Sequence, residues 1–431
     1  MADEEPYEPT IPDLRDPIRS ALDSVLDIAR PHTDGALASY IPELTRADPE
    51  ALGAALASVH GSVHESGDSE TTFTIQSVSK PFVFALALEQ SGLAEVIRHV
   101  GVEPSGEPFN AISLEPTTGR PLNPLINAGA IVMSSLIAGA TAEEKFDVIH
   151  AGLNAFAARE LDLDESVFES EHATGDRNRA LAYLTQSAGT LGSTAEVATG
   201  AYFRQCSVSV NARDLAIMAA TLANGGRNPI SGERVIGEDV ARWTTSVMTS
   251  CGMYDASGDW LVHVGLPAKS GVGGGIVAMQ PEEFGIGTFS PRLDERGNSV
   301  RGIVVLRTLS ERYGLHMLQH RGAPHSPIAQ LERDDRVDER GRGGGDTIAR
   351  LRGEVFFAGA EEVLTRLAPL VGDGGCLVLD FSNVTRVGSA AAAMFRGLPD
   401  VAGVGPDGRA RVEVLDPEGV LVAEGALAGE A

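Results

Sequence analysis

Lysine is nearly absent from this chain, and two of its three copies belong to two short motifs that lie far apart. The lysines among the 431 residues are Lys80, Lys145 and Lys269. Lys80 ends Ser77-Val78-Ser79-Lys80, an S-x-x-K motif, and Lys269 begins Lys269-Ser270-Gly271, a K-[ST]-G motif. Arginine stays protonated in proteins, whereas a lysine removed from water can lose its proton and act as a base. The two motifs therefore predict a fold that brings a serine hydroxyl close to a buried amine.

The segment after the first motif predicts the local structure around Ser77. The apolar run 82–88 is expected to form a helix that ends near Gly92, and Pro81 fits only in its first turn. Ser77 then lies at the start of a helix, where free N–H groups and the helix dipole favour developing negative charge. Lys80 follows one turn later on the same face of the helix.

Other segments predict a large body of helices and strands. The expected strands are 57–65, 71–75, 285–289 and 302–307, the last two paired with each other. The expected helices are 127–137 and 212–222, the second with Asn211 as its N-cap. The glycine-rich segment after Lys269 is typical of a strand that another backbone or a ligand approaches closely.

Composition divides the chain into two domains joined by a linker. Residues 1–15 are predicted to be a disordered acidic tail, and residues 16–320 the large domain. Residues 321–346 combine glycine, proline and mixed charge without apolar periodicity, which predicts a linker with a short helix around 328–331. Residues 347–431 are predicted to form a smaller domain in the order strand, helix, buried strand, helix. The fold class is therefore α/β in the α+β sense.

Charge and composition exclude several classes of function. The net charge of −26, from 34 basic and 60 acidic residues, argues against nucleic-acid or anionic-membrane partners. No apolar stretch approaches the length of a membrane span, and the acidic N-terminus lacks a secretory signal, so we expect a cytoplasmic protein. Three scattered cysteines and ten histidines without ligand spacing predict neither a disulfide frame nor a metal site, and we expect no cofactor.

The two lysine motifs together predict covalent chemistry on a serine. A serine hydroxyl is a poor nucleophile until a base takes its proton, and Lys80 is placed for that task. The S-x-x-K and K-[ST]-G pair is the signature of serine acyl-transfer enzymes built like penicillin-binding proteins. We therefore expect a hydrolase that forms an acyl-enzyme on Ser77. Its oxyanion would need N–H donors, most simply the backbone of Ser77 and of the segment just after Lys269.

The chain also resembles the serine-dependent glutaminases. The resemblance covers about residues 25–320 and is carried by seven segments in order: 38–42, 75–80, 123–131, 175–178, 202–207, 251–255 and 265–272. It implies a β-lactamase-like fold with an antiparallel sheet and a helical subdomain. It also implies hydrolysis of L-glutamine to L-glutamate and ammonia.

The resemblance implies a catalytic role for several of these residues. Ser77 matches the nucleophile and Lys80 its general base. Tyr40 and Tyr254 match the active-site tyrosines of the family, Tyr254 as a proton relay. Val272 matches the residue whose backbone N–H completes the oxyanion hole. Supporting positions in the same motifs are Gln76, Lys269, Ser270 and Gly271.

The resemblance also implies a substrate-binding set. Its members are Ser77, Asn127, Glu171, Asn178, Tyr202, Tyr254 and Val272. Free glutamine carries an ammonium and a carboxylate, so its pocket needs an anion such as Glu171 and donors such as the asparagines. From the local sequence alone, without the motifs, Tyr40 and Tyr202 are better interpreted as core aromatics and Glu171 as surface charge, and Asn178 could be a turn residue.

The last 85 residues resemble a STAS domain, the module found in anti-sigma-factor antagonists and as a tail on some glutaminases. Residues 386–389, Arg-Val-Gly-Ser, occupy the place of the Asp-Ser segment of that family, with glycine where aspartate is usual. Ser389 is therefore a candidate regulatory phosphorylation site. The alternative is an inert or oligomer-forming module, and the sequence identifies no partner for it.

These observations lead to one functional prediction and two alternatives. We expect a cofactor-free glutaminase that acts on L-glutamine and assembles as a homo-oligomer, either a dimer or a tetramer. A β-lactam-binding serine acyltransferase is the first alternative, and the absence of a signal peptide and of an S-D-N triplet argues against it. The second is a non-catalytic signalling protein that senses glutamine, and the intact pair of Ser77 and Lys80 argues against it.

Overall fold

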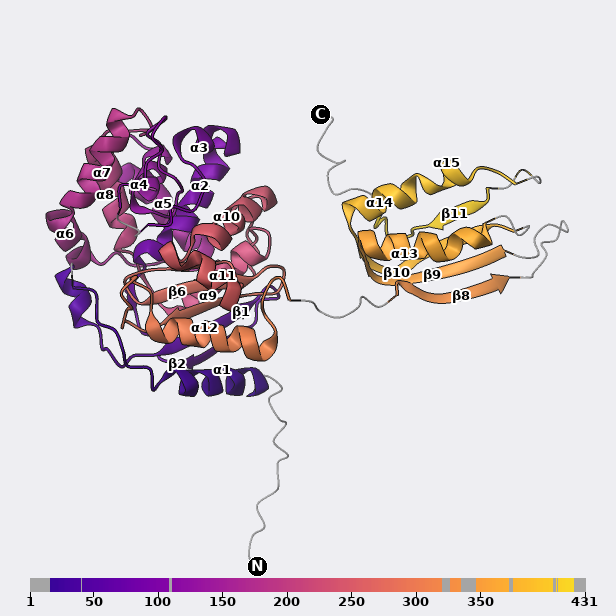
Figure 1. Ribbon diagram of the computed structural model, residues 1–431, viewed down its shortest axis with the longest axis horizontal. Coiled ribbons are helices and arrows are strands. Elements are labelled where there is room, and N and C mark those ends of the chain that lie inside the picture. The colour runs from indigo at the N-terminus through magenta and orange to yellow at the C-terminus, as the bar shows by residue number, and fades with distance from the viewer. Residues whose placement is uncertain are drawn as a thin grey trace, which may run out of the picture. The chain divides into compact units, whose positions relative to one another are not determined.

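Two structural units make up the described part of the chain, one ending at Gln319 and one beginning at His320 (Figure 1). The computed structural model describes residues 16–39, 41–107, 111–319, 326–334, 346–371, 375–405, 408 and 410–421. The predicted tail 1–15, Tyr40 and most of the predicted linker lie outside these ranges. No helix within them is both long and apolar enough to cross a membrane.

A five-stranded antiparallel sheet in the order β2-β1-β7-β6-β5 forms the base of the first unit. Its strands are β1 (Gly53–Ser58), β2 (Val63–Gly67), β5 (Ala268–Ser270), β6 (Gly275–Gln280) and β7 (Phe284–Phe289). Two hairpins, β1-β2 and β6-β7, are joined by the pairing of β1 with β7. The sheet therefore links the first third of the chain to the strand that contains Lys269.

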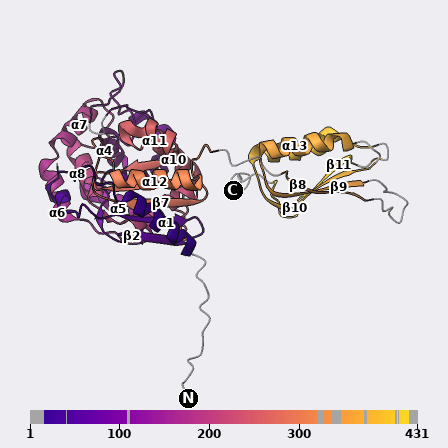
Figure 2. The same cartoon turned by 60° about the horizontal axis from the view of Figure 1, so that its bottom comes forward.

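Helices cover both faces of this sheet. On one face lie α1 (Asp16–Ala29) and α12 (Val300–Tyr313), which Figures 1 and 2 show side by side. On the other face lies α9 (Ala212–Ala223), which approaches β7 at two glycines. A Cβ at Gly285 would lie 2.2 Å from the backbone nitrogen of Ala220, so only glycine permits this contact.

The remaining helices of the first unit form a helical region around α2. Their bounds are α2 (Lys80–Ser91), α3 (Leu93–His99), α4 (Asn127–Leu136), α5 (Ala142–Ala157), α6 (Glu165–Thr174), α7 (Asp176–Ser187), α8 (Ala195–Cys206), α10 (Glu238–Cys251) and α11 (Ser257–His263). The shorter elements are η1 (Pro42–Arg46), β3 (Phe73–Thr74), η2 (Gln76–Ser79), β4 (Ser209–Val210) and η3 (Tyr254–Ala256). Residues Lys80–Leu88 of α2 are all buried, so this helix is the centre of the largest apolar core.

Several of the sequence predictions for this unit are confirmed. Helix α4 begins at Asn127, and α9 is capped by Asn211, whose side chain accepts a hydrogen bond from the N–H of Asp214. Pro81 lies in the first turn of α2, and the strand expected at 285–289 is β7. The fold class is also confirmed, since an antiparallel sheet with helices is followed by a smaller αβ unit.

Three local predictions are wrong. Residues 302–307 were expected to form a strand but belong to α12, because Gly302, Leu306 and Leu309 follow a helical spacing that a four-residue apolar run conceals. Residues 57–65 form two strands with a turn at Gly61, where φ is +91°. Residues 328–331 lie in a strand rather than in a short helix, so the predicted linker contains part of the second sheet.

The second unit is a four-stranded sheet covered by helices. Its strands are β8 (Ile328–Asp334), β9 (Asp346–Val355), β10 (Leu377–Val387) and β11 (Val412–Leu415), in the order β11-β10-β9-β8. β9, β10 and β11 run parallel, and β8 runs antiparallel to β9. The helices are α13 (Phe357–Leu367), η4 (Ala368–Leu370), α14 (Ser389–Arg396) and α15 (Leu398–Ala402). From β9 to α14 the order is strand, helix, strand, helix, as predicted.

Candidate active site

Ser77 lies in a tight turn at the start of α2. The turn is the 3-10 helix η2, and the backbone N–H of Lys80 donates to the carbonyl of Ser77 within it. Ser77 is buried, with 5% of its surface exposed. Gln76, directly before it, has a φ of +47°, a conformation that non-glycine residues rarely adopt and that is concentrated at functional sites.

The Lys80 side chain is fully enclosed by protein. Its Nζ donates to Oδ1 of Asn127 at 2.7 Å and to the carbonyl of Leu125 at 3.3 Å. Neither bond goes to Ser77, although the two residues are one turn apart. Burial lowers the pKa of Lys80 to about 8, opposed in part by the charge of Glu171. An amine with this pKa is partly unprotonated near neutral pH and can accept a proton.

The hydroxyl of Ser77 is hydrogen-bonded to Tyr254. Tyr254 donates its own hydroxyl hydrogen to the carbonyl of Ser270 at 2.9 Å. It must therefore accept from Ser77, in agreement with the way this contact acts to lower the pKa of Tyr254. Burial has the larger effect and raises that pKa above its usual value. Tyr254, like Gln76, has a positive φ, here +57°.

The side chain of Lys269 packs against the aromatic ring of Tyr254. Its Nζ lies 3.9 Å from the centroid of the Tyr254 ring and donates to the carbonyl of Ser270. Lys269 has no exposed surface, and burial, with a smaller contribution from the charge of Lys80, holds its pKa well below the usual value. The lysine of the second motif thus contacts the tyrosine that holds the serine of the first motif.

Glycines allow the second motif to approach the Ser77 turn. A Cβ at Gly271 would lie 2.9 Å from the Val78 side chain, and one at Gly273 would lie 2.4 Å from the carbonyl of Thr74. The close backbone approach predicted for this strand is therefore confirmed. Val272 lies between the two glycines and is buried.

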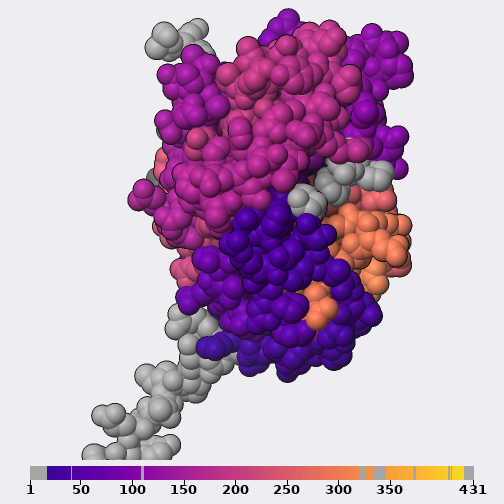
Figure 3. All heavy atoms as spheres, turned by 90° about the vertical axis from the view of Figure 1, so that its left-hand side faces the viewer, coloured from indigo at the N-terminus to yellow at the C-terminus, as the bar shows by residue number. Residues whose placement is uncertain are grey.

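A cavity of about 120 Å³ opens beside Ser77. It is lined by Ile41, Gln76, Ser77, Asn127, Glu171, Thr174, Gly175, Arg177, Asn178 and Tyr202. Its wall joins the N-terminal part of the chain to helices α4, α6, α7 and α8. Figure 3 shows a face on which this N-terminal part, in indigo, lies directly against the helical region, in magenta.

Glu171 places a buried carboxyl group in the wall of this cavity. It is 6% exposed, so its interpretation as surface charge is wrong. Within the described ranges, its Oε2 atom has no hydrogen-bond partner. Burial raises the pKa of Glu171 to about 8, opposed by the charge of Lys80 and by a hydrogen bond from Gln76. A ligand ammonium placed here would supply the missing partner and favour the carboxylate.

Asparagines link Lys80 to the far side of the cavity. The Nδ2 atom of Asn127 donates to Oδ1 of Asn178 at 2.9 Å, while Oδ1 of Asn127 accepts from Lys80. Asn178 lies in α7 and not in a turn, and Tyr202 lies in α8 with 2% of its surface exposed. The structure thus brings Ser77 and Lys80 close to three of the predicted binding residues, which are Asn127, Asn178 and Tyr202.

Some predicted residues lie elsewhere. Val272 does not line the cavity beside Ser77, Tyr40 is outside the described residues, and Ser389 is exposed at the start of α14 in the second unit. The sequence analysis did not single out Arg177 or Ile41 as cavity residues. The signal for both was their position next to the predicted residues Asn178 and Tyr40.

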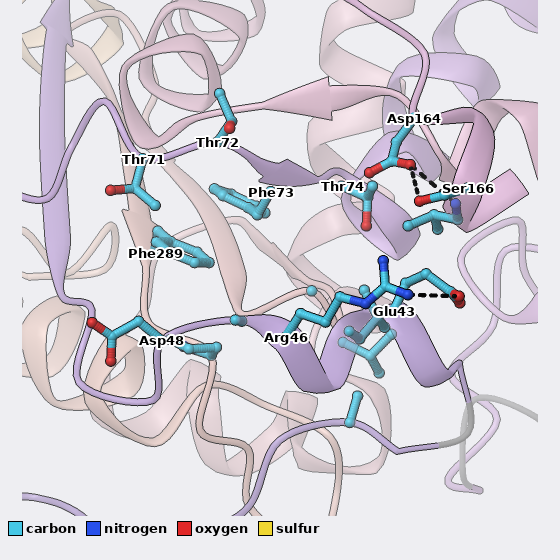
Figure 4. Close-up of a pocket in the computed structure, with 17 residues that line it drawn as sticks. Glu43, Arg46, Asp48, Thr71, Thr72, Phe73, Thr74, Asp164, Ser166 and Phe289 are labelled. Atoms are coloured by element: carbon cyan, nitrogen blue, oxygen red, sulfur yellow. Dashed lines mark hydrogen bonds and ion pairs between the residues drawn. The ribbon is translucent and has the colours of Figure 1, made fainter.

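A second cavity of about 260 Å³ lies on the other side of Thr74. Figure 4 shows Arg46 reaching into it from η1 and pairing with Glu43, near the stacked rings of Phe73 and Phe289. Val272 and Gly273 line this second cavity, whereas Ser77 lines the smaller one.

No described group of three or more histidine, cysteine or acidic side chains is arranged to hold a metal ion.

Comparison with known proteins gives a consistent result. Residues 35–318 match the glutaminase family model, and residues 337–400 match the STAS domain model. The chain is 51% identical to Glutaminase 1 of Bradyrhizobium diazoefficiens over 70% of its own length, but spans only 49% of that relative. It is 41% identical to the glutaminase of Corynebacterium glutamicum, over 94% of this chain and 95% of that one. A crystal structure of a protein called Mglu superimposes with a TM-score of 0.82, at 42% identity, over 94% of this chain and 99% of Mglu.

Proposed function

Because this chain belongs to the glutaminase family and ends in a STAS domain, we propose that it hydrolyses L-glutamine to L-glutamate and ammonia through an acyl-enzyme on Ser77. One observation carries the mechanism. Lys80, one turn from Ser77, is a buried amine whose pKa is lowered to about 8 and whose hydrogen bonds go only to neutral oxygens.

The charges of the cavity support an amino-acid substrate. The unpaired Oε2 atom of Glu171 suits the α-ammonium of glutamine. Asn178 and Arg177, which also line the cavity, suit its α-carboxylate. Bound in this way, the substrate extends its side-chain amide toward Ser77.

In the first half-reaction, Oγ of Ser77 bonds to the amide carbon while the hydroxyl proton passes to the unprotonated amine of Lys80. The N–H groups of Ser77 and Val272 hold the oxyanion that forms. The carbon–nitrogen bond then breaks, and the proton returns to the leaving nitrogen to give ammonia. Tyr254, in contact with Ser77, relays this proton.

In the second half-reaction, a water molecule takes the place of ammonia. Lys80 accepts a proton from the water as its oxygen bonds to the acyl carbon. The bond to Oγ breaks, Ser77 regains its proton and L-glutamate leaves. No cofactor takes part in this sequence.

The proposal is tested by ammonia release from the full chain. Wild type should release ammonia from L-glutamine, and Ser77→Ala should reduce kcat by at least about 10³-fold, because the nucleophile is lost. Ser310→Ala, which removes a buried hydroxyl that donates to the carbonyl of Val264, is the matched control. Turnover of Ser77→Ala close to that of wild type would refute the covalent mechanism.

Two further expectations from the sequence stay predictions. One is that the protein is a dimer or tetramer, and the other is that it works in the cytoplasm. The partner of the STAS domain is not identified.

A further inference from the structure

Four buried polar groups form a hydrogen-bonded chain behind the Ser77 turn. Oγ of Ser134 in α4 donates to Oε1 of Gln205 in α8 at 2.9 Å. Nε2 of Gln205 donates to Oγ of Ser79 at 2.9 Å, and Oγ of Ser79 donates to the carbonyl of Gln76 at 2.7 Å. The side chains of Ser134, Gln205 and Ser79 have no exposed surface. We refer to these three side chains as the relay.

The direction of the relay is fixed by its last acceptor. A carbonyl can only accept, so the single hydroxyl hydrogen of Ser79 goes to Gln76. Ser79 must then accept from Gln205, which places the Nε2 atom of that amide toward Ser79 and its Oε1 atom toward Ser134. Gln205 and Ser79 are thus each held in one orientation, and the carbonyl of Gln76 is held at the end. The single hydroxyl hydrogen of Ser134 is shared between Gln205 and the carbonyl of Ala130, which lies 3.0 Å from its Oγ.

The carbonyl of Gln76 and the N–H of Ser77 belong to one planar peptide unit. The described chain has no cis peptide bond, so this N–H points opposite to the carbonyl. The carbonyl is drawn toward Ser79. The N–H is therefore directed to the start of the turn, where Gly271 and Gly273 approach it on either side of Val272.

We infer that Gln205 and Ser79 are positioning residues that aim the N–H of Ser77 at the oxyanion. The inference rests on the proposed function, since it assigns this N–H to the acyl-transfer reaction. Gln76 shows why support is needed: its φ of +47° is unfavourable for a residue with a Cβ, and the surrounding structure must hold it. The hydroxyl of Ser79 provides such a hold on the peptide that follows.

The test is steady-state kinetics of the full chain with L-glutamine. Ser79→Ala removes the side-chain hydrogen bond to the Gln76 carbonyl and is expected to lower kcat roughly tenfold to a hundredfold, since losing one oxyanion donor outright costs about 10²–10³. KM should change by less than about threefold, because the relay does not line the substrate cavity. The rise of activity with pH should keep its midpoint, since Ser79 makes no contact with the amine of Lys80.

Ser310→Ala is the matched control. Ser310 is a buried serine of the same unit that donates to the carbonyl of Val264 at 2.6 Å, remote in sequence from the site. Both variants should lose a similar amount of thermal stability, but only Ser79→Ala should lose kcat. Equal kcat in Ser79→Ala, Ser310→Ala and wild type would overturn the inference.

Gln205→Leu is a second, independent variant of similar side-chain size. Ser79 keeps its hydroxyl in this variant but loses its donor, so kcat should fall roughly threefold to tenfold. If Ser79→Ala does not fold, the inference is tested by Gln205→Leu alone. A kcat of Gln205→Leu within twofold of wild type would contradict a role for the relay. An inactive wild type would instead refute the proposed function.

Discussion

The two ends of helix α4 each lie beside a buried lysine, and the surroundings of those lysines differ. At the first turn, Asn127 accepts a hydrogen bond from Lys80, close to the carboxylate of Glu171. At the last turn, Lys145 donates to the carbonyls of Ser135 and Ile137 at 2.9 and 2.5 Å. Burial lowers the pKa of both lysines.

The dipole of helix α4 acts on these two lysines in opposite directions. The positive end of α4 faces Lys80 and disfavours its ammonium form, whereas the negative end faces Lys145 and favours the ammonium form. Lys145 also supplies hydrogens that the last carbonyls of the helix need. A buried lysine is therefore not a catalytic feature by itself, and the groups around it decide its chemistry.

The largest expected effect is the loss of kcat when Lys80, but not Lys145, is replaced. Lys80→Met should lower kcat for L-glutamine by about 10³-fold, because general-base assistance contributes about 10²–10⁴-fold. The variant should still fold. The pKa of Lys80 is lower in the folded chain than in the unfolded one, so below pH 8 protonation of this lysine favours unfolding, and an uncharged methionine removes that contribution. Ammonia release and thermal melting of the purified variant measure both. A kcat within tenfold of wild type would remove Lys80 from the mechanism.

The pH dependence of kcat/KM tests the same amine without a substitution. Lys80 must be unprotonated to act as a base, and its pKa is about 8, so its deprotonation alone makes kcat/KM rise about tenfold per pH unit toward pH 8 and then flatten. Glu171 must be charged to bind the ammonium, and its pKa is also raised to about 8, so it changes the profile in the same direction. Initial rates at low glutamine concentration between pH 6 and 8.5 check this.

Glu171→Gln sharpens that measurement. The charge of Glu171 raises the pKa of Lys80, so its removal should move the rise of kcat/KM to lower pH while KM increases. A profile that is flat in wild type, or unmoved in Glu171→Gln, would contradict the assignment of the rise to Lys80.

The smallest effect on activity is expected at the other end of α4. Lys145→Met leaves two helix-end carbonyls without their donor and should lower the free energy of unfolding by roughly 1–3 kcal/mol. The kcat per folded molecule should stay within about twofold of wild type. Urea unfolding and ammonia release measure the two quantities. A selective loss of kcat would place Lys145 in the catalytic machinery and remove the contrast between the two lysines.

The sequence predicted those parts of the fold whose signals are local. Pro81 before an apolar run, Asn211 before α9 and the glycines after Lys269 each act within a few residues. Residues 302–307 were misassigned because Ile303-Val304-Val305-Leu306 suits a strand as well as a buried helix face, and only the longer spacing across α12 distinguishes them.

In the candidate site, the local sequence indicated residues where a motif fixed the residue type and gave no indication where burial decides the role. Glu171 was included only through the family resemblance, because it lies among charged and polar neighbours and packing of α6 against the rest of the unit turns it inward. Lys145 follows two glutamates in α5 and gave no sign of its bond to α4. The positive φ values of Gln76 and Tyr254 have no sequence signal, since neither is glycine.

The most direct measurement of the central claim is the detection of the acyl-enzyme. The full chain would be mixed with L-glutamine, quenched in acid during turnover, digested and examined by mass spectrometry. We predict a glutamyl group esterified to the peptide that contains Ser77, absent in Ser77→Ala and without glutamine. Rapid ammonia release with unmodified Ser77 throughout, and with an active Ser77→Ala variant, would contradict covalent catalysis at this turn.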